Sequence, residues 1–145
     1  MQGCMKQFGD WGNYHSYRDY TFANPTIPGQ YAILTVTGDV LLKIFGVCTT
    51  AVTTTVGVGT CSLGIAANVA FILPVIVGDL LAVREIWHDA TPDSEIENTS
   101  AIRSVIITDG NDVTLDTLVA NFTAGVIRFY YTWLPLSDDA NVVNA

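Results

Sequence analysis

The chain has 145 residues, of which half are hydrophobic and 14% are charged, and its formal net charge at pH 7 is −8. This length predicts one domain with a substantial core. An average soluble chain has about 25% charged residues, so the low charge content indicates that something other than water covers part of the surface. The negative charge argues against functions that neutralise phosphates, so neither nucleic acid nor a membrane surface is expected as a partner.

The first thirty residues differ in composition from the rest of the chain. Aromatic side chains recur at roughly three-residue intervals among Gly, Asn, Ser and Asp. The glycines weaken a helical interpretation, so we predict an extended N-terminal arm over residues 1–30. An arm folded back over its own domain and an arm that reaches another subunit are equal alternatives. Because aromatics are enriched where proteins meet, four of them are candidate subunit or lattice contacts: Trp11, Tyr14, Tyr17 and Tyr20.

From residue 31 to residue 145 the pattern is that of a β domain. Turn signals such as "TGD", "DGND" and "TAG" separate eight or nine predicted short strands, among them "YAILTVT", "DVLLKIFGVCTT", "CSLGI", "VAFILPVIV", "LLAVREIW", "AIRSVIIT", "DVTLDTL" and "GVIRFYYTWLPL". Short strands at regular spacing without a persuasive helix are typical of a sandwich or barrel. The predicted fold class is all-β, an antiparallel sandwich or a jelly-roll-like barrel with an extended N-terminal arm.

Two of these segments show which faces they bury. Side chains alternate along a strand, so in residues 126–133 the predicted core face holds Ile127, Phe129, Tyr131 and Trp133. Residues 40–45 are apolar on nearly both faces. Such a strand lies in the middle of a sandwich or meets a neighbouring subunit.

Three cysteines, Cys4, Cys48 and Cys61, form an odd set without a CxxC spacing, which suits a reducing compartment and does not suggest zinc. The Thr- and Gly-rich tract between the last two predicts a long hairpin centred near residues 54 and 55. That register would place Cys48 across from Cys61, where a disulfide is one alternative. Two buried free thiols are the expected state.

Residues 64–83 have the length of a membrane span, but Pro74, Gly78 and Asp79 interrupt the run and no basic residues flank it. We therefore expect two buried strands separated by a turn. The first twenty residues lack the features of a signal peptide, which predicts synthesis in the cytoplasm.

Residues 85–97, "EIWHDATPDSEIE", gather one histidine and five carboxylates. A metal site would combine His88 with carboxylates of this stretch, namely Asp89, Asp93, Glu95 or Glu97. One histidine beside acids in a Pro-containing turn is a weak zinc signature, and calcium is the less unfavourable ion. An acid/base pair of Asp89 with Asp93 or Glu95 lacks a nearby sugar platform.

The simpler interpretation is an acidic turn that leaves a buried strand at Trp87, with Pro92 fixing the backbone. We predict neither a metal nor a cofactor, and we expect this turn to make subunit or lattice contacts through Trp87, His88, Asp89 and Asp93. Residues 108–116 begin like a calcium loop, but Val113 occupies a ligand position and no glutamate closes it. No catalytic motif is present.

Three stretches together resemble a set of small proteins encoded among the head and tail structural genes of tailed bacteriophages: "VTGDVLLKIFGVCTTAV", "EIWHDATPDSEIE" and "TAGVIRFYYTWLPLSDDANVVNA". The pattern of that set is close to "TGDVLVRLFGV", "AGEIWHDATPDA" and "TAGVIEFYAFWRPLSADGNVVAA". The resemblance covers about residues 35–145, so the arm before Pro28 lies outside it. Here "AVREIW" replaces a glycine-bearing turn, and Leu134 stands where an arginine is common, so no binding role is transferred to that position.

The resemblance implies a component of the virion rather than an enzyme. The first expectation is a capsid decoration (cement) protein, a homotrimer seated on the major capsid protein at the capsid surface, because size, acidity, β content and the arm suit that role. A tail or tail-tip component, with a receptor- or glycan-binding surface, is the second expectation, and a hydrolytic enzyme is the third. We further expect that deletion of residues 1–24 weakens attachment without unfolding the β domain.

Overall fold

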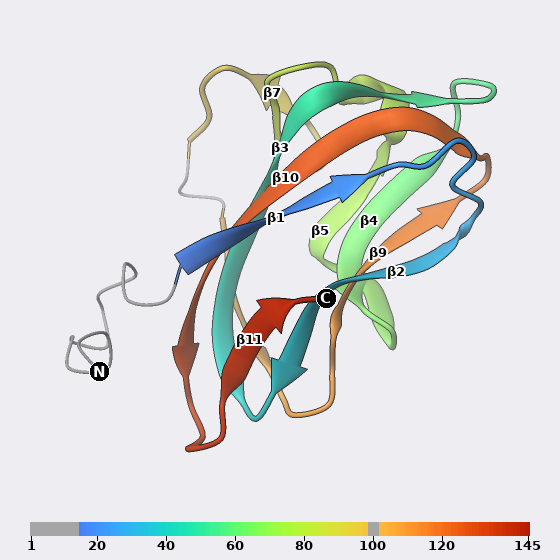
Figure 1. The fold of residues 1–145 in the computed structure, drawn as a ribbon. Helices are drawn as coiled ribbons and strands as arrows, with labels where there is room; N and C mark the ends of the chain where they lie inside the picture. The colour runs from blue at the N-terminus through green and yellow to red at the C-terminus, as the bar shows by residue number, and fades with distance from the viewer. Residues whose placement is uncertain (1–14, 99–101) are drawn as a thin grey trace.

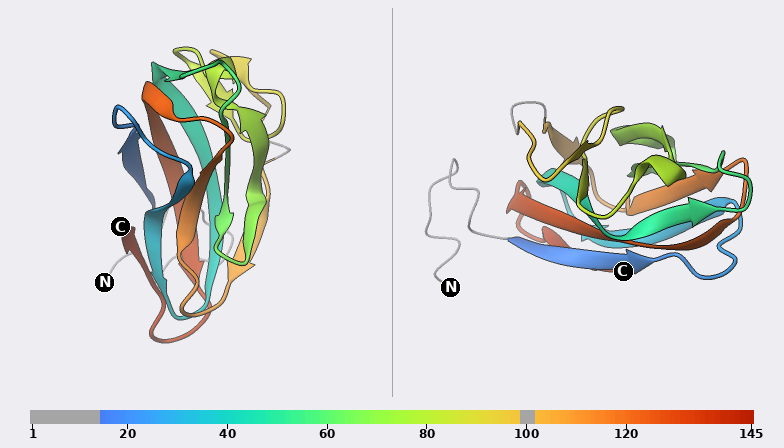
Figure 2. Two further views of the ribbon diagram at one scale, coloured as in Figure 1. Left: turned by 90° about the vertical axis from the view of Figure 1, so that its right-hand side faces the viewer. Right: turned by 90° about the horizontal axis from the view of Figure 1, so that it is seen from above.

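The computed structural model describes residues 15–98 and 102–145, and their fold is almost entirely β. The expected all-β antiparallel sandwich is confirmed: the described strands form two antiparallel sheets that enclose one apolar core, and these residues contain no α-helix. Figure 2 shows the two layers from the side and from above. Trp11 and Tyr14 lie outside the described residues.

Sheet A contains β1 (His15–Thr21), β3 (Val40–Thr54), β6 (Glu85–Trp87), β7 (Asp93–Ser94), β8 (Ser104–Ile107) and β10 (Phe122–Pro135). Sheet B contains β2 (Gly29–Thr37), β4 (Thr60–Ile65), β5 (Asn68–Val77), β9 (Val113–Leu118) and β11 (Asn141–Asn144), and a short 3-10 turn, η2 (Gly78–Leu80), follows β5. The strand order is β1-β10-β3-β6-β7 in sheet A, with β8 also paired to β3, and β11-β2-β9-β4-β5 in sheet B (Figure 1).

The core face predicted for residues 126–133 is confirmed. The four predicted side chains of β10, Ile127, Phe129, Tyr131 and Trp133, are all buried between the sheets. The Phe129 ring lies 6.2 Å from that of Trp87, which β6 also directs into the core. Alternation along a strand therefore marked the buried face correctly.

β3 lies in the middle of sheet A, as its two apolar faces indicated. It pairs with β10 on one side and with β6 and β8 on the other. Val40 and Leu42 are fully buried, whereas Leu41, Lys43 and Phe45 on the opposite side are only half-buried. The outer face of β3 therefore forms part of the protein surface.

The described part of the predicted arm is built into the sandwich. β1 pairs along its whole length with β10, and the following Phe22 is 3% exposed and belongs to the core. Deletion of residues 1–24 would remove this edge strand and a core ring, so the structure does not support the expectation that it leaves the domain intact. Deletion of residues 1–14 spares both.

The hairpin predicted between Cys48 and Cys61 is wrong. β3 belongs to sheet A and β4 to sheet B, and residues 55–59 carry the chain across from one sheet to the other, with Gly57 at a φ of 69°. The two cysteines are free and buried in different sheets. Burial raises the pKa of both thiols, that of Cys61 to about 12, so neither is a reactive thiolate near neutral pH.

Residues 64–83 contain the end of β4, a turn, the ten-residue β5 and η2. None of the helices in the described residues is long and apolar enough to cross a membrane. β5 is an edge strand, where a proline such as Pro74 is tolerated more readily than in a central strand. The expectation of full burial is wrong for this strand, because Phe71 and Val75 are half-exposed.

The turns of the sandwich gather at two ends of different composition. The acidic end, at the bottom of Figure 1, consists of residues 38–39, 108–112 and 136–140 and carries five carboxylates: Asp39, Asp109, Asp112, Asp138 and Asp139. The apolar end, at the upper right, consists of residues 23–28, 55–59, 78–80 and 118–121, and Asp79 is its one charged residue.

Candidate functional site

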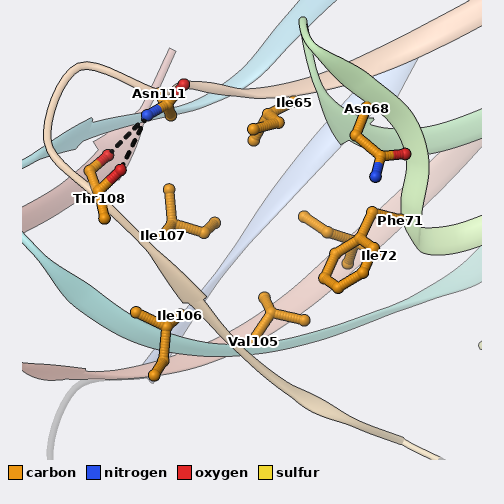
Figure 3. A pocket seen from close by; sticks show the side chains of 9 residues that line it. All are labelled: Ile65, Asn68, Phe71, Ile72, Val105, Ile106, Ile107, Thr108 and Asn111. Atoms are coloured by element: carbon orange, nitrogen blue, oxygen red, sulfur yellow. Dashed lines mark hydrogen bonds between the residues drawn. The ribbon is translucent and has the colours of Figure 1, made fainter.

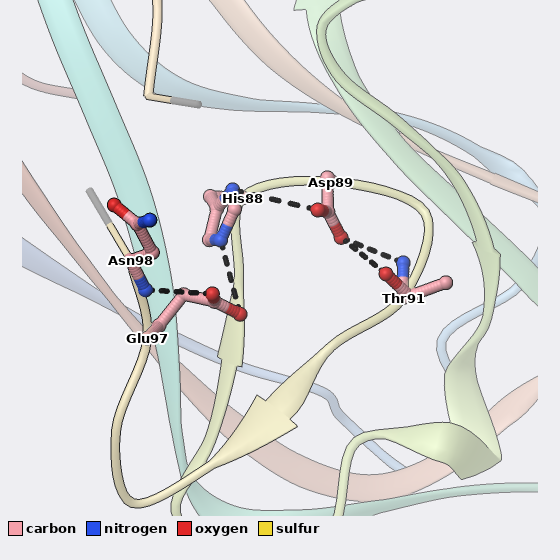
Figure 4. Close-up of polar contacts among 5 residues, drawn as sticks. All are labelled: His88, Asp89, Thr91, Glu97 and Asn98. Carbon is pink, nitrogen blue, oxygen red and sulfur yellow. Dashed lines mark hydrogen bonds and ion pairs between the residues drawn. The ribbon is translucent and has the colours of Figure 1, made fainter. Parts of the chain in front are cut away.

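The acidic turn of residues 88–97 is held by the short hairpin of β6 and β7. Register pairs Glu85 with Ser94 and Ile86 with Asp93. Before and after the hairpin, Arg84 and Glu95 adopt positive φ angles of 75° and 70°, and their side chains form an exposed ion pair of 3.1 Å. The chain then turns back, which brings Glu97 against His88 (Figure 4).

His88 is buried between two carboxylates. Its Nε2 lies 3.1 Å from Oε2 of Glu97, and its Nδ1 lies 3.9 Å from Oδ2 of Asp89 (Figure 4). Asp89 Oδ1 accepts the backbone N–H of Thr91 at 2.7 Å and its hydroxyl at 3.0 Å, which fixes the start of the turn that the sequence predicted. The turn is therefore closed by its own polar side chains.

The charges of this turn influence one another. The backbone N–H of Asn98 donates to Glu97 at 2.7 Å and, with His88, lowers the pKa of Glu97. The negative charge of Glu97 in turn raises the pKa of Asp93. The described residues contain no group of three or more His, Cys, Asp or Glu side chains placed to hold a metal ion.

The four candidate contacts of this turn lie at different depths. Trp87 is fully buried and His88 nearly so, which leaves them to shape the turn from below. Asp89 is partly exposed and Asp93 is exposed, so these two carboxylates are the members of the set that a partner can reach.

A second surface is the outer face of β1, β10 and β3, where aromatic rings from three strands meet. Tyr17 is half-exposed, its ring centroid is 6.3 Å from that of Tyr130, and Tyr130 stacks on Phe45 at 5.6 Å. Tyr20 does not share this face. It packs on the core beside Phe22, and burial raises its pKa to about 12.

An ion pair fixes one side of this aromatic face. Arg128 donates from Nε and Nη2 to the two carboxylate oxygens of Asp19, at 2.7 and 2.8 Å, while its guanidinium lies 4.3 Å from the centroid of the Tyr17 ring. These contacts lower the pKa of Asp19 and raise that of Arg128. The sequence placed Arg128 on the outer face of its strand, but it offered no signal that β1 pairs there.

A pocket of about 230 Å³ opens at the side of the sandwich between β8 and the β4–β5 hairpin (Figure 3). Its lining is mainly apolar, and Figure 3 shows Val105 and Ile107 of β8 on one side and Phe71 and Ile72 of β5 on the other. Arg103 bridges the two sheets here by donating to the carbonyl of Phe71 at 3.0 Å. The pocket suits an apolar side chain, and the sequence did not predict it because its walls come from separate sheets.

Comparison with known proteins gives one likeness of fold. No protein-family model matches the chain, and neither does any curated protein. A chain in the acidic stable capsid structure of Helicobacter pylori bacteriophage KHP30 is similar to it with a TM-score of 0.50 and 10% sequence identity. The similarity covers 91% of this chain and 94% of that chain, so the likeness of fold extends over most of both chains.

Proposed function

We propose that this chain is a structural protein of a bacteriophage particle, which decorates the capsid as a homotrimer and stabilises the lattice of the major capsid protein. The observation that carries the proposal is the likeness of fold to a chain of a phage capsid structure over more than nine tenths of both chains. The resemblance of residues 35–145 to small structural proteins of tailed phages supports it from sequence motifs rather than from the fold.

The surface chemistry suits a role based on contact area. Exposed apolar or aromatic side chains occur on the outer face of sheet A, on β5 and at the apolar end. If each subunit buries on the order of 1,000 Å² against its neighbours, the gross gain at about 25 cal/mol per Å² is large even after the cost of association. Such a protein stabilises the shell without a catalytic group.

Three surfaces can meet the capsid. They are the acidic turn through Asp89 and Asp93, the aromatic face around Tyr17, and the pocket between β5 and β8. The first is negatively charged, whereas the second is aromatic and its Arg128 is neutralised by Asp19, so the two surfaces favour partners of different chemistry. Residues 1–14, with the predicted contacts Trp11 and Tyr14, precede β1 in the sequence.

The test is the number and location of copies in purified particles of the phage that encodes the chain. Quantitative mass spectrometry gives the ratio to the major capsid protein, and antibody labelling in electron microscopy gives the location. We expect a copy number comparable to that of the capsid lattice positions and labelling over the head. A handful of copies at the tail would contradict decoration and would identify a tail component instead.

A further inference from the structure

The apolar end of the sandwich exposes a group of large aliphatic side chains. Each of the six is between 47% and 70% exposed: Ile27, Val56, Val58, Leu80, Leu118 and Val119. They come from four separate loops, so no single stretch of sequence contains the group. Scattered exposed apolar residues are ordinary on protein surfaces, but a contiguous group at one end indicates a contact.

Backbone contacts tie these loops into one surface. The N–H of Thr55 donates to the carbonyl of Asn121 at 3.0 Å, and Thr117 Oγ1 donates to the carbonyl of Ile27 at 3.2 Å. The N–H of Gly78 donates to the carbonyl of Gly59 at 2.8 Å. The loops that carry the six side chains therefore lie next to one another, as Figure 1 shows at the upper right.

Val119 is held in an unfavourable backbone conformation. Its φ of 75° lies in the left-handed region, which a β-branched residue rarely adopts and which costs free energy. Val119 is nevertheless the most exposed of the six side chains. Neither burial within the chain nor backbone preference accounts for an aliphatic residue at this turn, whereas a contact with another molecule does.

The same end is nearly free of charge. Its four loops hold Asp79 as their one charged residue, while five carboxylates lie at the acidic end. Two copies of a chain with a net charge of −8 repel each other, and the cost is least where they meet through uncharged surfaces with their acidic ends apart. By contrast, the acidic turn and the aromatic face would bring charged groups together.

We infer that the apolar end is the contact between copies of this chain. The six side chains expose on the order of 600 Å², which with a polar rim approaches the roughly 800 Å² that each partner buries in a standard interface. The inference rests on the self-association that the proposed function includes, and it names the surface that makes it. The acidic turn, the aromatic face and the pocket are then left for the capsid.

The test is sedimentation velocity of the full chain over a range of concentrations, for the wild type and for a Val56→Asp, Val119→Asp double variant. We expect the wild type to self-associate. The double variant should associate more weakly, with a dissociation constant at least about tenfold higher than that of the wild type. Val119→Asp alone is also compared with its matched control, Ile106→Asp, which adds the same single charge at an equally exposed position on sheet A and leaves association unchanged.

A second variant keeps the result independent of folding. Asparagine tolerates the left-handed region better than valine, so Val119→Asn should raise the thermal midpoint while it weakens association. A wild type that stays monomeric, or an equal loss from Ile106→Asp, overturns the inference. If the wild type is monomeric and the double variant no longer binds capsids, the apolar end is the capsid contact.

The two proposals fail separately. Sedimentation of the free protein tests the contact between copies, and copy number in particles tests decoration. If the protein self-associates but is absent from the head, the proposal of capsid decoration is wrong and the proposed contact between copies still holds. If the protein is a monomer and is present on every head, the proposed contact between copies is wrong and the proposal of capsid decoration still holds.

Discussion

At the acidic end, carboxylates accept hydrogen bonds from the backbone of neighbouring turns. Asp109 accepts the N–H of Gly38 at 2.8 Å, and Asp39 accepts the N–H of Asp109 at 3.0 Å. At the apolar end, hydroxyls and carbonyls accept instead, as Thr54 does from Gly59 at 3.3 Å and Asn121 from Thr55 at 3.0 Å. Both ends satisfy their turns, but only the acidic end uses charge to do so.

The two ends therefore differ in which side chains hold the fold together and which remain free to contact a partner. Asp39 is partly exposed and Asp109 is exposed, yet both carboxylates already accept hydrogen bonds from backbone amides, so a count of acidic residues overstates how much charge is free for a partner. The aliphatic side chains at the opposite end accept nothing and remain in solvent. A partner therefore gains more from covering the apolar end than from binding the acidic one.

The largest predicted effect is at the packing beneath the apolar end. Phe122 is fully buried and stacks on Phe22 with ring centroids 4.6 Å apart. Phe122→Ala should lower the free energy of unfolding by about 3–5 kcal/mol, because it removes a ring and leaves a cavity. Urea denaturation measures this, with the exposed Leu80→Ala as the control that should change little. A loss below about 1 kcal/mol would show that this end collapses easily.

The second largest loss of stability is expected from a substitution in a turn of the acidic end. Gly38 has a φ of 65°, and a Cβ there would lie 2.5 Å from Ser137 Oγ and 2.8 Å from Ala140 Cα. Gly38→Ala should therefore cost about 2–4 kcal/mol, from backbone strain and from contact with the next turn. Gly110→Ala is the matched control, since its φ is 79° but nothing lies within 4 Å of its Cβ. Equal losses would mean that backbone strain alone acts.

Removal of one carboxylate should have a smaller effect. Asp109→Ala leaves the N–H of Gly38 without its acceptor, which should cost about 1 kcal/mol. Asp138, exposed at the same end, serves as the comparison, and its replacement by alanine should stay within about 0.5 kcal/mol. If both variants behave alike in urea denaturation, the carboxylates of this end are not structural and the contrast with the apolar end fails.

The sequence patterns predicted which face of a strand is buried better than they predicted which strands lie side by side. Alternation in residues 126–133 identified Ile127 and Phe129 as core residues because the period of a strand is two. The same pattern does not say which strand lies beside which, so the pairing of β1 with β10 was missed and Cys48 was placed opposite Cys61. Phe22 was assigned to the arm for the same reason.

The two ends of the sandwich show the same limit of prediction from sequence, which is that turns far apart in the chain come together only in the fold. The turn signals "TGD" and "DGND" predicted turns at residues 37–39 and 109–112, but that they meet is a property of the topology. Ile27, Val56 and Val119 are likewise far apart in the chain and adjacent only in the fold. The acidic turn was the opposite case, because its residues are contiguous and its Asp89 to Thr91 hydrogen bond is local.

The smallest expected effect concerns Glu97 in the acidic turn, which lies outside the acidic end. Its carboxylate also accepts a hydrogen bond from the backbone, and the prediction tests whether that contact stabilises the fold. The pKa of Glu97 is lowered because Asn98 N–H and His88 favour its charged form. A lowered folded pKa contributes stability that is present above the unfolded value and is lost as the pH falls through the folded value. The wild type should therefore lose stability below about pH 4.5, the ordinary glutamate pKa, and Glu97→Gln should lose less.

Asp93 should act in the opposite direction. The charge of Glu97 raises its pKa, so its contribution is present at low pH and is lost as the pH rises through the folded value. Asp93→Asn should then be slightly more stable than the wild type at neutral pH and equal to it in acid. Thermal unfolding of the wild type and both variants from pH 3 to pH 7 measures the differences, in which the titration of other carboxylates cancels. Parallel curves would show that Glu97 and Asp93 are not coupled, and the turn would then hold its shape through Asp89 and Thr91 alone.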